Sequence, residues 1–350
     1  MRIRLALLLA FAIGCGSSEE VFIGELTAPV VYGADDRVEV FGHPDLDLRR
    51  IAQESIVALI LSFRIDRKPD GTYALFSQTL QDLQRLCPDE LFGNQPTAAS
   101  CSGVLIDDDL VVTAGHCIDA FAPCEFYAYV FNYHLDGPDR LATIRDEDVY
   151  SCARVVALSR PEFDSHTPDF AVVQLDRPVE GAHAPVSIRP AAPLAEQEPV
   201  AMIGFGSGLP AKIDSGGEVH DPRAEQLDFF IANVDAFQGH SGSATFDSKN
   251  RLAGILIGGR TPDYVTLDDE TCRRVSVYPD SAAAEVVHNV APIVASLCAE
   301  GWEAEEICGP GVVPSNSSAC SASTGSAGFL SGCLGLLLFV AARRLRRPAA

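Results

Sequence analysis

The sequence predicts an all-β fold of the barrel type, on three observations. From about Ile56 to Gly259, short apolar runs are divided by Asp, Gly, Pro and Asn, which favour turns. Few stretches have a helical period. The exception is residues 280–300, where Asp or Ser precedes an Ala-rich apolar run that predicts a C-terminal helix. The strand-like runs do not alternate with helices, which disfavours βαβ units.

Six apolar runs have the length expected of strands. They are "SIVALILSF" (55–63), "SGVLI" (102–106), "DLVVTAGH" (109–116), "FAVVQL" (170–175), "PVAMIGF" (199–205) and "RLAGILIGG" (251–259). The acidic "IDDDL" (106–110) lies between two of them and is interpreted as a solvated turn. "GFGSGLP" (204–210) has the glycines of a dinucleotide fingerprint, but Leu209-Pro210 stops the helix that the fingerprint needs, so it also predicts a turn.

Composition indicates a folded, acidic protein. The 350 residues allow one large domain or two small ones, and 47% of them are hydrophobic, so the chain can bury a sizeable core. The formal net charge is -22. Such a surface repels polyanions, so we expect no nucleic-acid partner.

The first fifteen residues are typical of an export signal. Arg2 and Arg4 precede the apolar "LALLLAFAIG", and polar "GSSEE" follows, which disfavours a buried first helix. Cys15 after "AIG" resembles a bacterial lipoprotein signal, although Ala12 stands where leucine is usual. Lipidation at Cys15 and plain cleavage nearby both stay open.

The other end predicts a linker over residues 301–328 and a hydrophobic helix with a basic tail over residues 329–350. The apolar run is short for a membrane span, which needs about 20 residues, and its Arg cluster favours the cytoplasmic side. The pattern resembles the C-terminal sorting tails of myxobacterial surface proteins; a simple anchor is the alternative. We expect a cell-surface or secreted protein that meets the membrane only through this tail or a lipidated Cys15.

Eight cysteines between the two ends predict disulfides in an exported domain. Eight cysteines permit 105 connectivities. No C-x-x-C or H-E-x-x-H motif is present, so we expect no metal and no organic cofactor. The eight are Cys87, Cys101, Cys117, Cys124, Cys152, Cys272, Cys298 and Cys308.

The segment "DAFQGHSGSATF" (235–246) places Ser241 between a histidine and a glycine. A serine hydroxyl becomes a nucleophile only when a base takes its proton and a carboxylate orients that base. His116 in "VVTAGHC" and Asp169 in "TPDFAVVQL" have comparably distinctive settings. The order His116, Asp169, Ser241, with Ser243 two residues after Ser241, excludes an α/β-hydrolase elbow, which has the serine first and a glycine there.

"CSGVLIDDDLVVTAGHC", "DFAVVQL" and "GHSGS" together resemble the trypsin-like serine peptidases, above all the secreted bacterial branch that includes the glutamyl endopeptidases. "VVYGADDRVEV" (30–40) is similar to the leading segment of such enzymes. The resemblance implies a peptidase domain within residues 30–300, built of two six-stranded antiparallel barrels.

Carried over by motif, Ser241 is the nucleophile, His116 the general acid and base, and Asp169 the residue that orients His116. The backbone N–H groups of Gly239 and Ser241 form the oxyanion hole. The resemblance also implies a Cys101–Cys117 bridge behind His116. A local Cys298–Cys308 bridge is expected as well, and the other four cysteines stay unpaired at this stage.

The sequence departs from trypsin at the serine. His240 replaces the aspartate that pairs with the new N-terminal amine on activation, so the resemblance does not carry that switch over. Phe237 replaces a cysteine of the animal enzymes. Among bacterial relatives position 240 is variable, so catalysis is still expected.

Asp235, Gly258 and Arg260 are the candidate substrate-binding residues. Asp235 occupies the place of the acidic pocket floor of trypsin, which predicts cleavage after Arg or Lys. Bacterial relatives often have this aspartate without that preference. Glutamate specificity is disfavoured because Leu256 stands where those enzymes have a histidine. Residue specificity therefore stays open, as does the oligomeric state.

The sequence therefore predicts an exported serine endopeptidase that cleaves protein or peptide substrates through an acyl-enzyme. Two alternatives stay open: an inactive, peptidase-like surface-binding protein, and an esterase.

Overall fold

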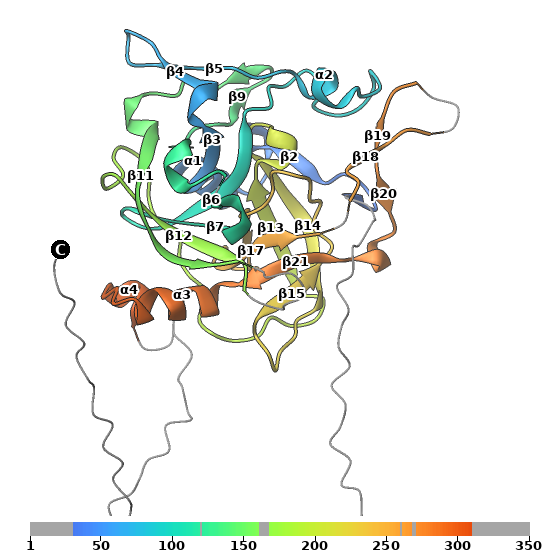
Figure 1. Ribbon diagram of the computed structural model, residues 1–350. Coiled ribbons are helices and arrows are strands. Elements are labelled where there is room, and N and C mark those ends of the chain that lie inside the picture. Colours follow the sequence, from blue (N-terminus) through green and yellow to red (C-terminus); the bar gives the residue numbers. More distant parts are fainter. Residues whose placement is uncertain (1–30, 120, 161–167, 260, 268–270, 310–350) are drawn as a thin grey trace, which may run out of the picture. The chain divides into compact units, whose positions relative to one another are not determined.

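A computed structural model describes residues 31–119, 121–160, 168–259, 261–267 and 271–309 (Figure 1). Strands dominate it, which confirms the all-β prediction. The α-helices in this part of the chain are α1 (Leu46–Glu54), α2 (Leu80–Gln84), α3 (Val290–Ala299) and α4 (Glu305–Cys308).

Six antiparallel strands close the first barrel. In spatial order they are β11 (Val149–Ser159), β12 (Phe170–Leu175), β7 (Leu110–Thr113), β6 (Ala99–Asp107), β3 (Ile56–Leu61) and β8 (Tyr127–Val130). The turn between β6 and β7 consists of Asp108 and Asp109 from the acidic "DDD" run, as the sequence predicts, and Asp107 ends β6.

The second barrel is also a closed ring of six antiparallel strands, because β14 pairs with β13 as well as with β15. In spatial order its strands are β13 (Pro199–Gly204), β16 (Ala244–Phe246), β17 (Leu252–Gly258), β21 (Glu285–Asn289), β15 (Phe229–Ala232) and β14 (Lys212–Asp221). Strand β2 (Arg37–Glu39) is added to the outer side of β14. The expected two-barrel architecture is thereby confirmed.

Short strands form four two-stranded ribbons around the barrels. They are β1 (Val31–Tyr32) with β20 (Val277–Tyr278), β4 (Ile65–Arg67) with β5 (Tyr73–Leu75), β9 (Leu135–Gly137) with β10 (Arg140–Leu141), and β18 (Tyr264–Val265) with β19 (Arg274–Val275).

The apolar run in β3 explains how the barrels are joined. Successive side chains of a strand point to opposite faces. Val57 and Leu59 belong to an apolar cluster confined to the first barrel. Ile56, Ala58 and Ile60 belong to a cluster shared with the second barrel. Because both faces of β3 are buried, its sequence is continuously apolar rather than alternating.

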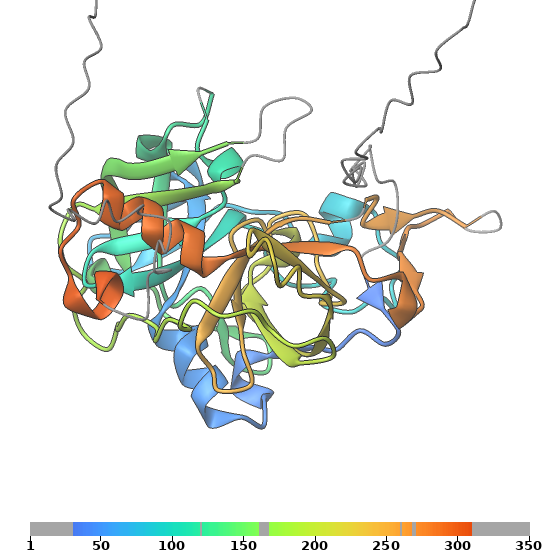
Figure 2. The same ribbon diagram turned by 90° about the horizontal axis from the view of Figure 1, so that it is seen from below.

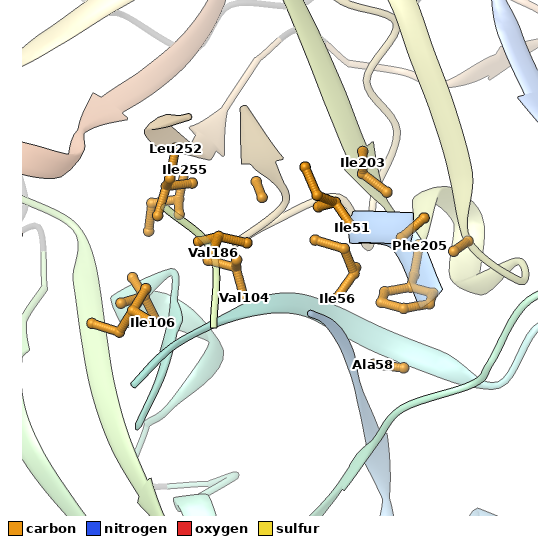
Figure 3. Packing of buried hydrophobic residues seen from close by; sticks show 14 of the residues in the cluster. Ile51, Ile56, Ala58, Val104, Ile106, Val186, Ile203, Phe205, Leu252 and Ile255 are labelled. Carbon is orange, nitrogen blue, oxygen red and sulfur yellow. The ribbon is translucent and has the colours of Figure 1, made fainter. Parts of the chain in front are cut away.

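The shared cluster gives the two barrels a common core. In Figure 3, Val104 and Ile106 from β6 gather with Leu252 and Ile255 from β17. Helix α3 extends this contact, since it follows β21 of the second barrel and lies against β11 and β12 of the first (Figure 2). The barrels are therefore held in one relative position, which matters for any site between them.

The prediction of one helix over residues 280–300 is wrong in its first half. Residues 285–289 form β21, which pairs with both β15 and β17 and closes the second barrel. The two adjacent β-branched residues, Val286 and Val287, favour this state. The helix begins only at Val290, after Asn289.

Four disulfides occur in the described residues. The expected bridges Cys101–Cys117 and Cys298–Cys308 are both present. The four cysteines that the sequence left unpaired form Cys87–Cys272 and Cys124–Cys152. Cys298–Cys308 ties α4 to α3, and the Trp302 indole donates to Asp107 at 2.9 Å. Residues 301–309, expected to begin the linker, thus pack on the barrels.

The expected signal, Cys15 and the hydrophobic tail lie outside the described residues. Within the described ranges, no helix is both long enough and apolar enough to cross a membrane.

Candidate active site

The paired strands β7 and β12 bring His116 and Asp169 together. Thr113 at the end of β7 lies opposite Ala171 near the start of β12. The chain continues from β7 into a short 3-10 turn that carries His116, and Asp169 immediately precedes β12. Residues 53 positions apart in the sequence are thus neighbours at one end of the first barrel.

Asp169 accepts two hydrogen bonds from His116. One carboxylate oxygen accepts the backbone N–H at 2.8 Å, and the other lies 2.6 Å from the ring Nδ1. The carboxylate is buried, whereas the His116 side chain is 41% exposed. Gly115 permits this approach, because a Cβ there would lie 2.0 Å from the carbonyl oxygen of Ser159.

Ser241 reaches the same histidine from the second barrel. It lies in the loop that leads into β16, and its Oγ is 2.7 Å from the His116 Nε2. A carboxylate can only accept, so the His116 Nδ1 carries the proton and Nε2 is free to accept from the Ser241 hydroxyl. The three side chains therefore form one chain of hydrogen bonds in the polarity that nucleophile activation requires.

Residues 235–241, here called the serine loop, are held by hydrogen bonds on nearly every backbone group near Ser241. Ser102 in β6 uses its N–H to donate to the Ser241 carbonyl and its hydroxyl to donate to the Gly239 carbonyl, each at 2.8 Å. Asp263 accepts the Gln238 N–H at 2.9 Å. Within the described residues, the N–H groups of Gly239 and Ser241 donate to no acceptor. Two backbone donors beside Ser241 thus stay available.

Gly239 is required by the path of this loop. Its φ is +96°, and a Cβ there would lie 2.8 Å from the carbonyl oxygen of Phe205. A side chain would meet both a strained backbone and a clash. The sequence-based expectation of a glycine at this turn therefore has a specific steric reason.

Asp235 lies in the serine loop, but its carboxylate is directed to the start of the chain. Its two oxygens accept the N–H groups of Tyr32 and Asp36, each at 2.9 Å. Burial, followed by the charge of Asp214, raises the pKa of Asp235. The carboxylate that the sequence suggested for substrate binding is thus already bonded to the protein's own backbone.

Of the two remaining candidates for substrate binding, Gly258 and Arg260, the structure describes only Gly258. Gly258 ends β17, and a Cβ there would meet no atom within 4 Å, so space is open beside it. Leu256 is buried. Arg260 lies outside the described residues.

Three residues that support the serine loop are absent from the sequence-based prediction: Ser102, Asp263 and Arg37. Ser102 was visible as a small polar residue beside Cys101, but nothing in its local sequence indicates a partner 137 positions away. Arg37 lies over the Phe237 ring of the serine loop. It is the one cation in the acidic "GADDRVEV" run, and this isolated charge is a sequence feature that could have indicated a structural role.

No metal site is apparent around these residues: in the described ranges, no group of three or more His, Cys, Asp or Glu side chains is arranged to hold an ion.

Comparison with known proteins gives three similarities. Residues 101–255 match the family model of the trypsin-like peptidase domain. Snake venom serine protease catroxase-1 of Crotalus atrox is 25% identical over 170 residues, covering 48% of this chain. The match spans 58% of that relative's length, which is less than two thirds. A solved structure of a Glu endopeptidase in complex with MPD is similar at a TM-score of 0.42 and 18% identity, covering 66% of this chain and 89% of the other. The two closed barrels, the domain match and the serine protease relative together make the chain similar to the trypsin-like serine peptidases.

Proposed function

We propose that this protein is an exported serine endopeptidase with Ser241, His116 and Asp169 as its catalytic residues. The observation that carries the proposal is the pair of contacts made by His116, 2.6 Å to Asp169 and 2.7 Å to Ser241. The proposal that its substrates are proteins or peptides rests on the similarity to trypsin-like serine peptidases.

In the proposed reaction, the Ser241 Oγ attacks the carbonyl carbon of the scissile peptide while the His116 Nε2 takes the hydroxyl proton. Asp169 stabilises the imidazolium that forms. The N–H groups of Gly239 and Ser241 donate to the oxyanion of the tetrahedral intermediate, and one such donor contributes about 3 kcal/mol. Collapse breaks the C–N bond as His116 protonates the leaving amine. Water then hydrolyses the acyl-enzyme by the same steps.

Replacing Ser241 tests the proposal. We expect Ser241→Ala to abolish peptide hydrolysis and labelling by a serine-directed phosphonate, because no other hydroxyl in the described residues contacts the His116 Nε2. Ser243→Ala is the matched control, since the Ser243 hydroxyl is buried, has no hydrogen-bond partner among the described residues and lies two residues from Ser241. Ser243→Ala should be labelled like the wild type, and labelling that survives in Ser241→Ala contradicts the assignment.

Phosphonate labelling and a peptide library, both applied to the wild-type protein, also distinguish the two alternative functions. An inactive binding protein predicts no phosphonate labelling in the wild type. An esterase predicts labelling and ester hydrolysis but no cleavage anywhere in a peptide library. The library also reports the preferred residue at the cleavage site.

We also propose that the protein is exported from the cytoplasm. Four disulfides suit an oxidising compartment. Fractionating the native host with an antibody against the barrels tests whether the protein is at the cell surface or released, and a purely cytoplasmic signal contradicts export.

A further inference from the structure

The segment of residues 31–39, here called the leading segment, is bound against the serine loop. The Asp235 carboxylate accepts its Tyr32 and Asp36 N–H groups. Strands β1 and β2 pair with β20 and β14 on either side of these contacts. The backbone of the leading segment is therefore fixed relative to the loop that carries Ser241.

Arg37 in this segment is a buried cation. Its side chain is 2% exposed and forms two hydrogen bonds to Asp35, at 2.9 and 2.7 Å. The guanidinium carbon lies 3.8 Å from the centre of the Phe237 ring and 5.1 Å from that of Phe92. A guanidinium stacked on an aromatic face is attracted by the ring, and more strongly when both are withdrawn from water.

Phe237 links Arg37 to the backbone at Ser241. The Phe237 N–H donates to the His240 Nδ1 at 3.1 Å, and the His240 N–H returns a bond to the Phe237 carbonyl at 2.9 Å. Burial, with the nearby charges of Arg37 and Lys212, lowers the pKa of His240 to about 3. His240 is thus a neutral acceptor, and it lies between Gly239 and Ser241.

We propose that Arg37 is a positioning residue, which through Phe237 and His240 sets the direction of the Gly239 and Ser241 N–H groups. The inference rests on the proposed function. The path runs from the Arg37 guanidinium to the Phe237 ring, and then through the paired Phe237 and His240 hydrogen bonds to the Gly239 and Ser241 N–H groups. Displacing the ring would tilt the peptide planes that aim at the oxyanion.

Arg37 thereby fixes the geometry of the serine loop, which in trypsin an aspartate fixes through a different contact. In trypsin and its close relatives an aspartate at the place of His240 pairs with a newly formed terminal amine. Here residue 240 is a neutral histidine, and the cation near the serine loop is the buried side chain of Arg37 and not a terminal amine. In this inference the geometry of the serine loop is set by folding of the leading segment.

The test compares Arg37→Met and Arg37→Lys with wild type in the full-length protein. Active sites are titrated with a phosphonate, and kcat is expressed per titrated site. A displaced oxyanion donor costs less than the 100- to 1000-fold of a deleted one, so we expect kcat to fall about 10- to 100-fold for Arg37→Met. KM should change less than about threefold. Arg37→Lys, which keeps the charge but not the planar stack, should lie between Arg37→Met and wild type.

A peptide aldehyde gives a second readout, because its adduct with Ser241 places an oxyanion in the same site. Its inhibition constant should weaken in parallel with kcat, whereas binding of a non-covalent product peptide should not change. Phe237→Leu should reproduce both effects, and adding Arg37→Met to it should cause little further loss, since the two residues act in one path. If Arg37→Met fails to fold, Arg37→Lys and Phe237→Leu decide.

Arg223 provides the matched control. It also forms two hydrogen bonds to a nearby aspartate, Asp228, and stacks on Phe229 at 4.0 Å, neither of which belongs to the serine loop. Arg223→Met should lower the melting temperature without changing kcat per site. Arg37 variants that behave like this control overturn the inference. A wild type that is neither labelled nor active overturns the proposed function instead.

Discussion

At the scale of single residues, the position of Asp169 explains how one carboxylate can do two tasks. One oxygen accepts the His116 backbone N–H and fixes where the histidine lies. The other accepts from the ring Nδ1 and fixes the tautomer. A neutral amide can take over the first task in part but not the second, because its NH2 group donates.

Asp169→Asn should therefore retain the fold and lose most of the activity. In an arrangement of this kind the loss of the correct tautomer lowers kcat about 10⁴-fold. We expect that magnitude for peptide hydrolysis, with little change in KM. Asp176→Asn, at the other end of β12, is the control and should retain wild-type kcat. A loss smaller than about tenfold in Asp169→Asn would mean that the carboxylate does not orient His116 during the reaction.

At the scale of elements, the Cys101–Cys117 bridge joins β6 to the 3-10 turn that carries His116. The bridge closes a short loop, with a sequence separation of 16. Strand β6 also carries Ser102, which holds two carbonyls of the serine loop. The element that supports Ser241 is thus covalently tied to the one that supports His116.

The double variant Cys101→Ala/Cys117→Ala should lower both stability and activity. A bridge over a loop of about 15 residues contributes about 3 kcal/mol to the free energy of unfolding. Urea unfolding should show a loss of this size, and kcat per titrated site should fall as His116 gains freedom. Cys298→Ala/Cys308→Ala is the control, because that bridge also closes a short loop, with a separation of 10, and its loss should lower stability alone. Equal kcat values in the two pairs would refute the link to His116.

At the scale of the whole molecule, buried carboxylates determine how stability depends on pH. Burial raises the pKa of Asp214 to about 6, with the charges of Asp36 and Asp35 adding to the effect. Burial and then the charge of Asp214 raise that of Asp235 to about 8. An aspartate in an unfolded chain has a pKa near 3.9. Between these values the folded protein binds more protons than the unfolded one, so stability falls as pH rises.

The free energy of unfolding should therefore decrease from about pH 6.5 to pH 8. Below this window buried histidines such as His240, whose pKa is lowered, contribute a slope of the opposite sign. Each group contributes a slope of up to about 1.4 kcal/mol per pH unit while it is protonated only in the folded state. Urea titrations at four pH values measure the slope, and Asp235→Asn should flatten it. Asp247→Asn is the control: burial opposes the change, but bonds from Arg251 and the backbone lower the pKa of Asp247, so its effect falls below this window. An unchanged slope in Asp235→Asn would contradict the assignment.

The candidate catalytic residues could be predicted because each lies in a short local pattern. "TAGHC" and "GHSGS" place glycines near His116 and Ser241, and Gly115 and Gly239 show why, whereas "PDFAVV" places Asp169 directly before an apolar strand. Strand β21 could not be predicted in the same way. The alanines at 282–284 favour a helix locally and precede the strand, and pairing with β15 and β17 makes residues 285–289 a strand.

The sequence by itself determined the all-β class and the order of His116, Asp169 and Ser241, because these depend on composition and on residues close in the chain; the bridge beside His116 came only from the family resemblance. Only the tertiary structure decided what Asp235 and Arg37 contact. Their partners Tyr32 and Phe237 are about 200 positions away, and which buried charge meets which group depends on how the leading segment folds over the second barrel. As a result, the Asp235 carboxylate, which the sequence suggested for substrate specificity, is buried and accepts hydrogen bonds from backbone groups of the distant leading segment.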